Sequence, residues 1–129
     1  MTDDEVDEIV SFYARLEAKD TAFAVEKLTP AKLREAAAYV REHGLLKNPD
    51  EYGEPGGRCC TFGTLDAIIL TQYDHIDLNA AIENAWANVL RPGSDSAEIV
   101  AWNDGPATAQ DVIDLFEATA LRLEVADAT

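Results

Sequence analysis

Apolar residues recur every three or four positions in several separate stretches of the chain, which is the spacing of one face of an α-helix. The clearest stretch follows Thr29 and Pro30, a hydroxyl residue and a proline that together mark a helix start. Gly44 marks its end, because glycine readily takes the left-handed conformation that closes many helices. The pattern therefore predicts a helix over residues 30–43. Its buried side would carry Leu33, Ala36, Ala37, Tyr39 and Val40.

The N-terminal stretch, over residues 2–19, has the same spacing on one side. Its apolar positions are Val6, Ile9, Val10, Tyr13 and Leu16. Acidic residues crowd its first turns, where negative charge stabilises the positive end of the helix dipole. A single apolar stripe needs a surface to cover it, so we expect this helix to lie on the core and to break near Asp20 and Thr21. Phe23, Val25 and Leu28 would follow in a short helix or irregular turn. The alternative is an acidic docking tail.

The most apolar stretch runs from Cys60 to about Gln72, with Phe62, Leu65, Ile68 and Ile69 on one side. A helix that is apolar over most of its circumference belongs in the interior, so we predict that this is the central helix. Gly63 inside it costs about 1 kcal/mol relative to alanine, which indicates the close approach of another backbone.

Prolines and glycines punctuate residues 45–58, immediately before this helix. They predict a loop that is long for a compact domain and therefore functional or mobile. Leu45, Leu46 and Tyr52 are expected to hold it against the body.

The second half of the chain predicts two more helices. Asp77 is expected to cap the first, over residues 78–90, and Arg91-Pro92-Gly93 to end it. Thr108 is expected to cap the second in a variant of the capping box with Asp111, and its end is expected to fray after Val125. Its apolar stripe comprises Val112, Ile113, Leu115, Phe116, Ala120 and Leu123.

The segment between these helices contains a run of β-forming residues, 98–102. A lone strand cannot pair its own backbone groups, so we expect an extended linker with Ile99 and Trp102 packed inward, followed by a turn over residues 103–106. Together these elements predict an all-α fold: a compact bundle of about five helices around a buried central helix, with one long Gly/Pro loop. The 129 residues fit a single helical domain, with an acidic N-terminal helix over 1–19 and a core over 29–125.

Charge narrows the classes of partner. The formal net charge of −15 comes from 25 acidic and 10 basic side chains. Such a surface repels nucleic acid and anionic membranes. It either attracts a basic protein partner or simply keeps the protein soluble. No apolar run approaches the ~20 residues that span a bilayer, and the N-terminus lacks the regions of a signal peptide. We therefore expect a cytoplasmic protein that binds neither nucleic acid nor membrane, with its oligomeric state open.

The two cysteines, Cys59 and Cys60, are adjacent, and neighbouring residues bridge only through a strained ring. We expect reduced thiols. With His43 and His75 they supply the ligand types of a zinc site, but adjacent cysteines do not have the usual ligand spacing. Neither a metal nor another cofactor is predicted.

Cys60 is also a candidate nucleophile. A helix N-terminus and the neighbouring Arg58 would lower its pKa, His43 or His75 would serve as base, and Asn103 or Asp104 would orient that base. The alternative is a structural cysteine that fills the space beside Gly63.

Two short segments are candidate binding sites. Gly56-Gly57-Arg58 resembles an anion cradle, in which free amides and a guanidinium face a phosphate, although the phosphate-loop signature is absent. In Trp102-Asn103-Asp104, the Asn and Asp side chains are expected to build a turn, and a further hypothesis is that they reach across to hold Arg58. The candidate binding residues are therefore Arg58, Trp102, Asn103 and Asp104.

These segments carry a family resemblance. Cys60, Gly63 and Leu65, followed by Trp102-Asn103-Asp104 and the Thr108-capped helix, resemble the family numbered 6197 among domains of unknown function, found in actinobacteria and their phages. Thr64 departs from the family's alanine, and Cys59 is an addition. The resemblance covers about residues 33–123. It implies a small intracellular protein, phage-encoded in some cases, and implies no activity.

The function expected from these features is a non-enzymatic binding protein that engages a host or cellular protein. The alternatives are a small enzyme with Cys60 as nucleophile and an acidic nucleic-acid mimic. Mimicry requires carboxylates spaced like phosphates along an exposed face.

Overall fold

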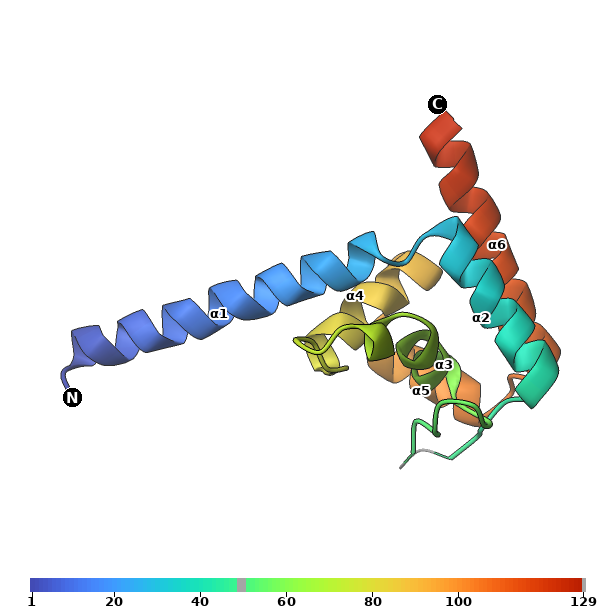
Figure 1. Ribbon diagram of the computed structural model, residues 1–129, viewed down its shortest axis with the longest axis horizontal. Helices are drawn as coiled ribbons and strands as arrows, with labels where there is room; N and C mark the ends of the chain where they lie inside the picture. Colours follow the sequence, from blue (N-terminus) through green and yellow to red (C-terminus); the bar gives the residue numbers. More distant parts are fainter. Residues whose placement is uncertain (49–50, 129) are drawn as a thin grey trace.

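The computed structural model describes residues 1–48 and 51–128, and within them the chain is all-α (Figure 1). Pro49, part of the predicted loop, lies outside the described residues. A short 3-10 turn, Leu70–Gln72, extends the third helix. The α-helices are α1 (Asp3–Glu26), α2 (Pro30–His43), α3 (Thr61–Ile68), α4 (Ala80–Leu90), α5 (Ser96–Asp104) and α6 (Ala109–Ala128). The predicted fold class is confirmed.

The prediction that the N-terminal helix lies on the core is wrong. Helix α1 runs unbroken through residues 20 and 21, where the Thr21 hydroxyl donates to the Glu17 carbonyl (2.8 Å). Only its last two turns, from residue 20, are packed. Ala24 is buried, and its carbonyl accepts a hydrogen bond from the Trp86 indole N–H (3.0 Å). The rest of α1 projects from the body (Figure 1).

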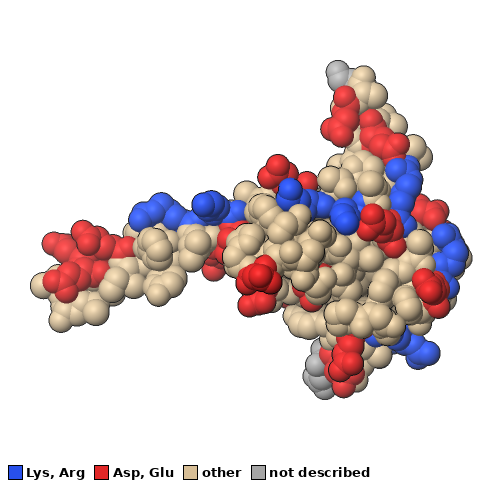
Figure 2. Space-filling model, in the orientation of Figure 1, with Lys and Arg blue, Asp and Glu red and all other residues tan. Residues whose placement is uncertain are grey.

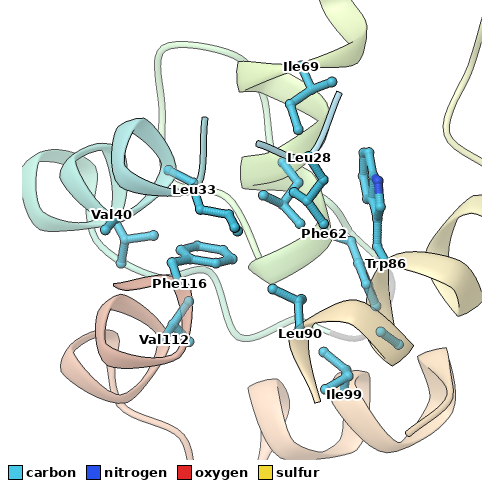
Figure 3. Close-up of a cluster of buried hydrophobic side chains, with 14 of the residues drawn as sticks. Leu28, Leu33, Val40, Phe62, Ile69, Trp86, Leu90, Ile99, Val112 and Phe116 are labelled. Carbon is cyan, nitrogen blue, oxygen red and sulfur yellow. The ribbon is translucent and has the colours of Figure 1, made fainter. Parts of the chain in front are cut away.

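The central position of α3 is confirmed. Phe62, Leu65 and Ile69 have at most 1% of their surface exposed. Side chains from α2, α4 and α6 surround them, and Figure 3 shows Leu33, Phe116 and Leu90 converging on this cluster. The helix is shorter than predicted, since regular α-helical structure ends at Ile68 and the 3-10 turn follows.

Helix α2 has the predicted limits. The Thr29 hydroxyl accepts from the Lys32 amide (3.2 Å), and Gly44 has a φ of 86°. Helix α2 lies along α6 (Figure 1), and an ion pair between Arg41 and Glu117 (2.9 Å) joins their exposed edges.

Four local predictions in the second half need correction, and the first two concern α4 and α5. Asn79 rather than Asp77 caps α4, accepting from the Ile82 amide (3.2 Å). The expected extended linker is the helix α5, whose cap is Asp95 (2.9 Å to the Glu98 amide). A lone strand would leave its backbone N–H and C=O groups unpaired, whereas a helix pairs them internally. This need for backbone hydrogen bonds overrides the β-forming preference of the side chains.

The inward packing of Ile99 is confirmed, because its side chain is fully buried. Residues 103 and 104 lie in the last turn of α5 rather than in the predicted turn. At the start of α6, Thr108 and Asp111 form the predicted reciprocal pair (3.0 and 3.1 Å). The helix then continues past Val125 to Ala128 instead of fraying. Within the described residues, no helix combines the length and the apolar character needed to cross a membrane.

Candidate functional site

A cavity of about 300 Å³ opens between the long loop, the start of α3 and the facing sides of α4 and α5. Its wall combines the apolar side chains Phe62, Ile99 and Val100 with polar groups from each of these elements. A concave site of this size with a few converging polar groups is typical of a binding pocket for a small molecule or a single side chain.

Asn103 joins the elements that form the cavity. Its Oδ1 accepts hydrogen bonds from both the amide (2.9 Å) and the hydroxyl (2.6 Å) of Thr61 at the start of α3. Its Nδ2 donates to the carbonyl of Leu46 in the loop (3.0 Å) and to Asp104 Oδ1 (3.0 Å). One buried amide therefore ties α5 to α3 and to the loop, and it holds the Asp104 carboxylate at the cavity.

Gly63 sets the position of the loop over the cavity. A Cβ at this residue would overlap the carbonyl oxygen of Tyr52, and it would lie 2.8 Å from the Tyr52 carbonyl carbon. The same Tyr52 carbonyl accepts a hydrogen bond from the Cys60 amide (3.0 Å). The predicted close approach of another backbone is therefore confirmed, and it brings the Tyr52 ring to the cavity.

Tyr39 holds the other part of the loop, and it occupies one of the two amides of the expected anion cradle. Its hydroxyl accepts from the Gly56 amide (3.0 Å) and donates to the Gly57 carbonyl (2.5 Å). The Gly57 amide donates to the Glu54 carbonyl (3.0 Å). These two amides are therefore not free to bind a phosphate, and the expectation of a cradle with free amides is wrong.

The charged group that dominates the cavity is the partly desolvated carboxylate of Glu83. Only 9% of Glu83 is exposed, and burial raises the pKa of its carboxyl, although a hydrogen bond from the Tyr52 hydroxyl opposes this. Burial and the Glu83 charge raise the pKa of Tyr52 to about 12. Glu51 and Asp104 add two further carboxylates, and none of the described residues that line the cavity is basic.

Cys60 lines this cavity, but its environment differs from the one expected of a nucleophile. Burial raises the pKa of its thiol to about 11, so the expected lowering is wrong. Its Sγ accepts a hydrogen bond from the Gly63 amide (3.3 Å), as the cap of α3. This favours the structural role beside Gly63.

The remaining candidate catalytic residues do not converge. Asp104 lines the cavity with Cys60, whereas neither histidine does. The His43 ring lies against Tyr39 (4.4 Å between centroids), and the His75 ring lies against Phe23 (5.2 Å). Within residues 1–48 and 51–128, no group of three potential ligands is placed to hold a metal ion.

Two of the predicted binding residues also lie elsewhere. Arg58 is exposed, and no ion pair joins it to Asp104, so the predicted contact between them is wrong. Trp102 is partly buried outside the cavity wall, with the Arg91 guanidinium 5.0 Å from its ring centroid. Of the four predicted binding residues, only Asn103 and Asp104 line the cavity.

Sequence reasoning missed Glu83 and Tyr52. A signal for Glu83 is present, because it precedes Trp86 and Ala87 by three and four residues and so shares their buried side of α4. A carboxylate on an apolar stripe indicates a site. Tyr52 carries no such signal, since it lies in an irregular loop.

Comparison with known proteins gives one match. The model of DUF6197, described as a family of unknown function, matches residues 25–122. No curated protein and no solved structure matches the chain.

Proposed function

This chain belongs to the DUF6197 family, whose function is unknown, and we propose from its cavity that it is a non-enzymatic protein-binding module. The cavity receives a basic side chain, lysine or arginine, from a protein partner. The observation that carries this proposal is Glu83, a carboxylate with little exposure whose cavity has no basic residue among its described lining.

A bound cation would relieve the cost of burying this carboxylate. Desolvation disfavours the charged form of a carboxyl group, and a positive charge at hydrogen-bonding distance favours it. Charge-assisted hydrogen bonds are also the stronger ones. The Tyr52 hydroxyl already favours the charged form of Glu83 and so lowers its pKa, and Asp104 supplies a second acceptor on the α5 side of the cavity.

The apolar wall distinguishes a side chain from a bare ion. Lysine and arginine carry three or four methylene groups below the charge, and these pack well on apolar surface. Phe62, Ile99 and Val100 offer such a surface beside the carboxylates. The net charge of −15 would steer a basic partner toward the molecule.

The test uses isotope-labelled full-length protein and follows its backbone amide resonances. N-acetyl-arginine amide and N-acetyl-lysine amide stand in for partner side chains, putrescine stands in for a free diamine, and N-acetyl-norleucine amide is the neutral control. We expect saturable shifts at Tyr52, Thr61 and Glu83 with the two basic amides and none with norleucine. A stronger response to putrescine would identify a free amine as the ligand, and no response to any cation would refute the proposal.

Two variants locate the binding. Glu83→Gln removes the buried charge with little change in shape and should weaken binding of the basic amides by about tenfold or more. Glu26→Gln makes the same change at an exposed position on α1, outside the cavity, and should leave binding unchanged. Equal weakening in both variants would point to nonspecific attraction by net charge.

The other expected functions have less support. On the face shown in Figure 2, acidic groups gather at the tip of α1 and are elsewhere separated by basic and neutral surface, whereas mimicry of nucleic acid needs a continuous row of carboxylates. Action on a host protein by a phage-encoded chain stays a prediction, which capture of one specific partner from an actinobacterial lysate would test.

A further inference from the structure

The free part of α1 is an amphipathic helix whose apolar side is not covered by any of the described residues. Its large apolar residues are between 42% and 62% exposed: Val6, Ile9, Val10, Phe12, Tyr13 and Leu16. The neighbouring body does not cover them, because residues 1–19 are exposed and the packed part of α1 begins at residue 20. Six such side chains on one helix are more apolar surface than scattered exposure explains.

We propose that this segment pairs antiparallel with the same segment of a second copy of the chain. The apolar positions are symmetric about residue 11: position 6 matches 16, position 9 matches 13, and position 10 matches 12. A twofold axis at the level of residue 11 therefore places each of these apolar residues level with an apolar residue of the other copy. Such a self-complementary contact is what a symmetric dimer requires.

The distribution of charge along α1 favours the antiparallel direction. Acidic side chains gather at the tip of α1, and basic ones follow nearer the body (Figure 2). On one flank of the apolar side, the antiparallel register brings Glu5 to within two residues of the level of Lys19 and Glu8 to within one residue of the level of Arg15, once in each direction. A parallel pair would instead hold the two acidic tips together, and like charges at close range oppose association.

The free length also fits this register. Residues 3–19 form a straight projection of about 24 Å at 1.5 Å per residue. In the antiparallel pair, residue 3 of one copy lies level with residue 19 of the other, which is where the body begins. The pair therefore uses the whole projecting segment without requiring the two bodies to overlap along it.

Sedimentation equilibrium of the full chain tests the pairing. We expect a concentration-dependent species with twice the 14.1 kDa mass of one chain. Ile9→Glu places a carboxylate in the middle of the apolar contact and should weaken the dimer about a hundredfold. Ala18→Glu adds the same charge on the opposite side of α1 and should have a much smaller effect. A wild-type chain that stays monomeric at all concentrations overturns the proposal.

A charge exchange tests the register. Glu5→Lys and Lys19→Glu each create like-charge contacts in a homodimer of the variant, so each variant alone should dimerise more weakly than the wild type. Mixed in equal amounts, the two should form a heterodimer in which both contacts join opposite charges again. Failure of the mixture to recover dimer, with each variant folded by circular dichroism, overturns the antiparallel register.

These results are independent of the cavity. Neither Ile9 nor the exchanged charges line it, so the variants that break the dimer should still bind the basic amides.

Discussion

Replacing Asn103 with alanine should destabilise the protein more than any other single loss of a polar side chain in the cavity wall. Its amide connects Thr61 at the start of α3, Leu46 in the loop, and Asp104 on its own helix. Asn103 is 2% exposed and Thr61 is 1% exposed, so water does not replace these contacts without rearrangement.

The magnitude follows from the groups left without a partner. The Thr61 amide and the Leu46 carbonyl each lose a hydrogen bond, and an unsatisfied buried group costs about 1–3 kcal/mol. Water that enters through the adjacent cavity would offset part of this, so we expect a loss of about 3 kcal/mol. At about 2.1 cal/mol/K of unfolding entropy per residue, a chain of this length would lose about 11 °C in Tm.

Thermal and urea unfolding of the wild type and Asn103→Ala measure this loss, and Asn103→Asp is the matched variant. Aspartate keeps the acceptor for Thr61 but places a second carboxylate beside Asp104, which raises its folded pKa above the unfolded value. Stability from such a group is present at low pH and is lost as the pH rises through the folded pKa. The defect of Asn103→Asp should therefore shrink in acid, while that of Asn103→Ala should not. A loss below about 1 kcal/mol in Asn103→Ala would refute the role of this residue.

Three further predictions concern single residues of the same region. Burial raises the pKa of Glu83 above its usual 4.5, so the wild type loses stability as the pH rises through the folded pKa of Glu83. The Tm of Glu83→Gln minus that of the wild type should therefore increase from pH 4 to pH 7. A difference in Tm that stays constant over this range would contradict the reasoning. Because the pKa of Cys60 is raised to about 11, iodoacetamide should label it slowly at neutral pH in the folded protein and faster in urea, whereas rapid native labelling would restore the nucleophile hypothesis. Gly63→Ala should lower the Tm and weaken binding of the basic amides, since the Tyr52 backbone must move and overpacking costs about 1–3 kcal/mol; unchanged Tm and affinity would show that the loop yields freely.

The sequence predicts those elements whose limits are set by local chemistry. Thr29 and Gly44 bound α2 as expected because a hydroxyl cap and a left-handed glycine act within one turn of the chain. The pair of Thr108 and Asp111 is equally local. The sequence also predicts the close backbone approach at Gly63, because a glycine within a helix is unfavourable unless another backbone packs against it. The Tyr52 backbone makes that approach.

The cavity could be predicted only in part because its members depend on tertiary contacts. The sequence predicts Asn103 and Asp104 as candidates, but Asn103 binds Thr61 and Leu46 instead of the expected partner Arg58, and Asp104 accepts from Asn103. Which side chain meets a buried amide is decided by how α3 and α5 pack, and no spacing along the chain encodes that. The same is true of Cys60, whose raised pKa follows from burial, whereas its sequence neighbours indicated the opposite direction.

The error over α1 has a physical explanation that bears on both proposals. Periodicity shows that a helix has an apolar side, but it does not show what covers that side. Helices α2 to α6 bury a core among themselves, and α1 contributes to it only through its last turn, around Ala24. The family match begins at residue 25, where α1 meets the body, and it includes every described residue that lines the cavity. The proposed cation site therefore belongs to the part of the chain that matches the family, and the proposed pairing belongs to the projecting segment before it. A partner bound at the cavity and a second copy bound at α1 would occupy separate surfaces, so one dimer would present two cavities.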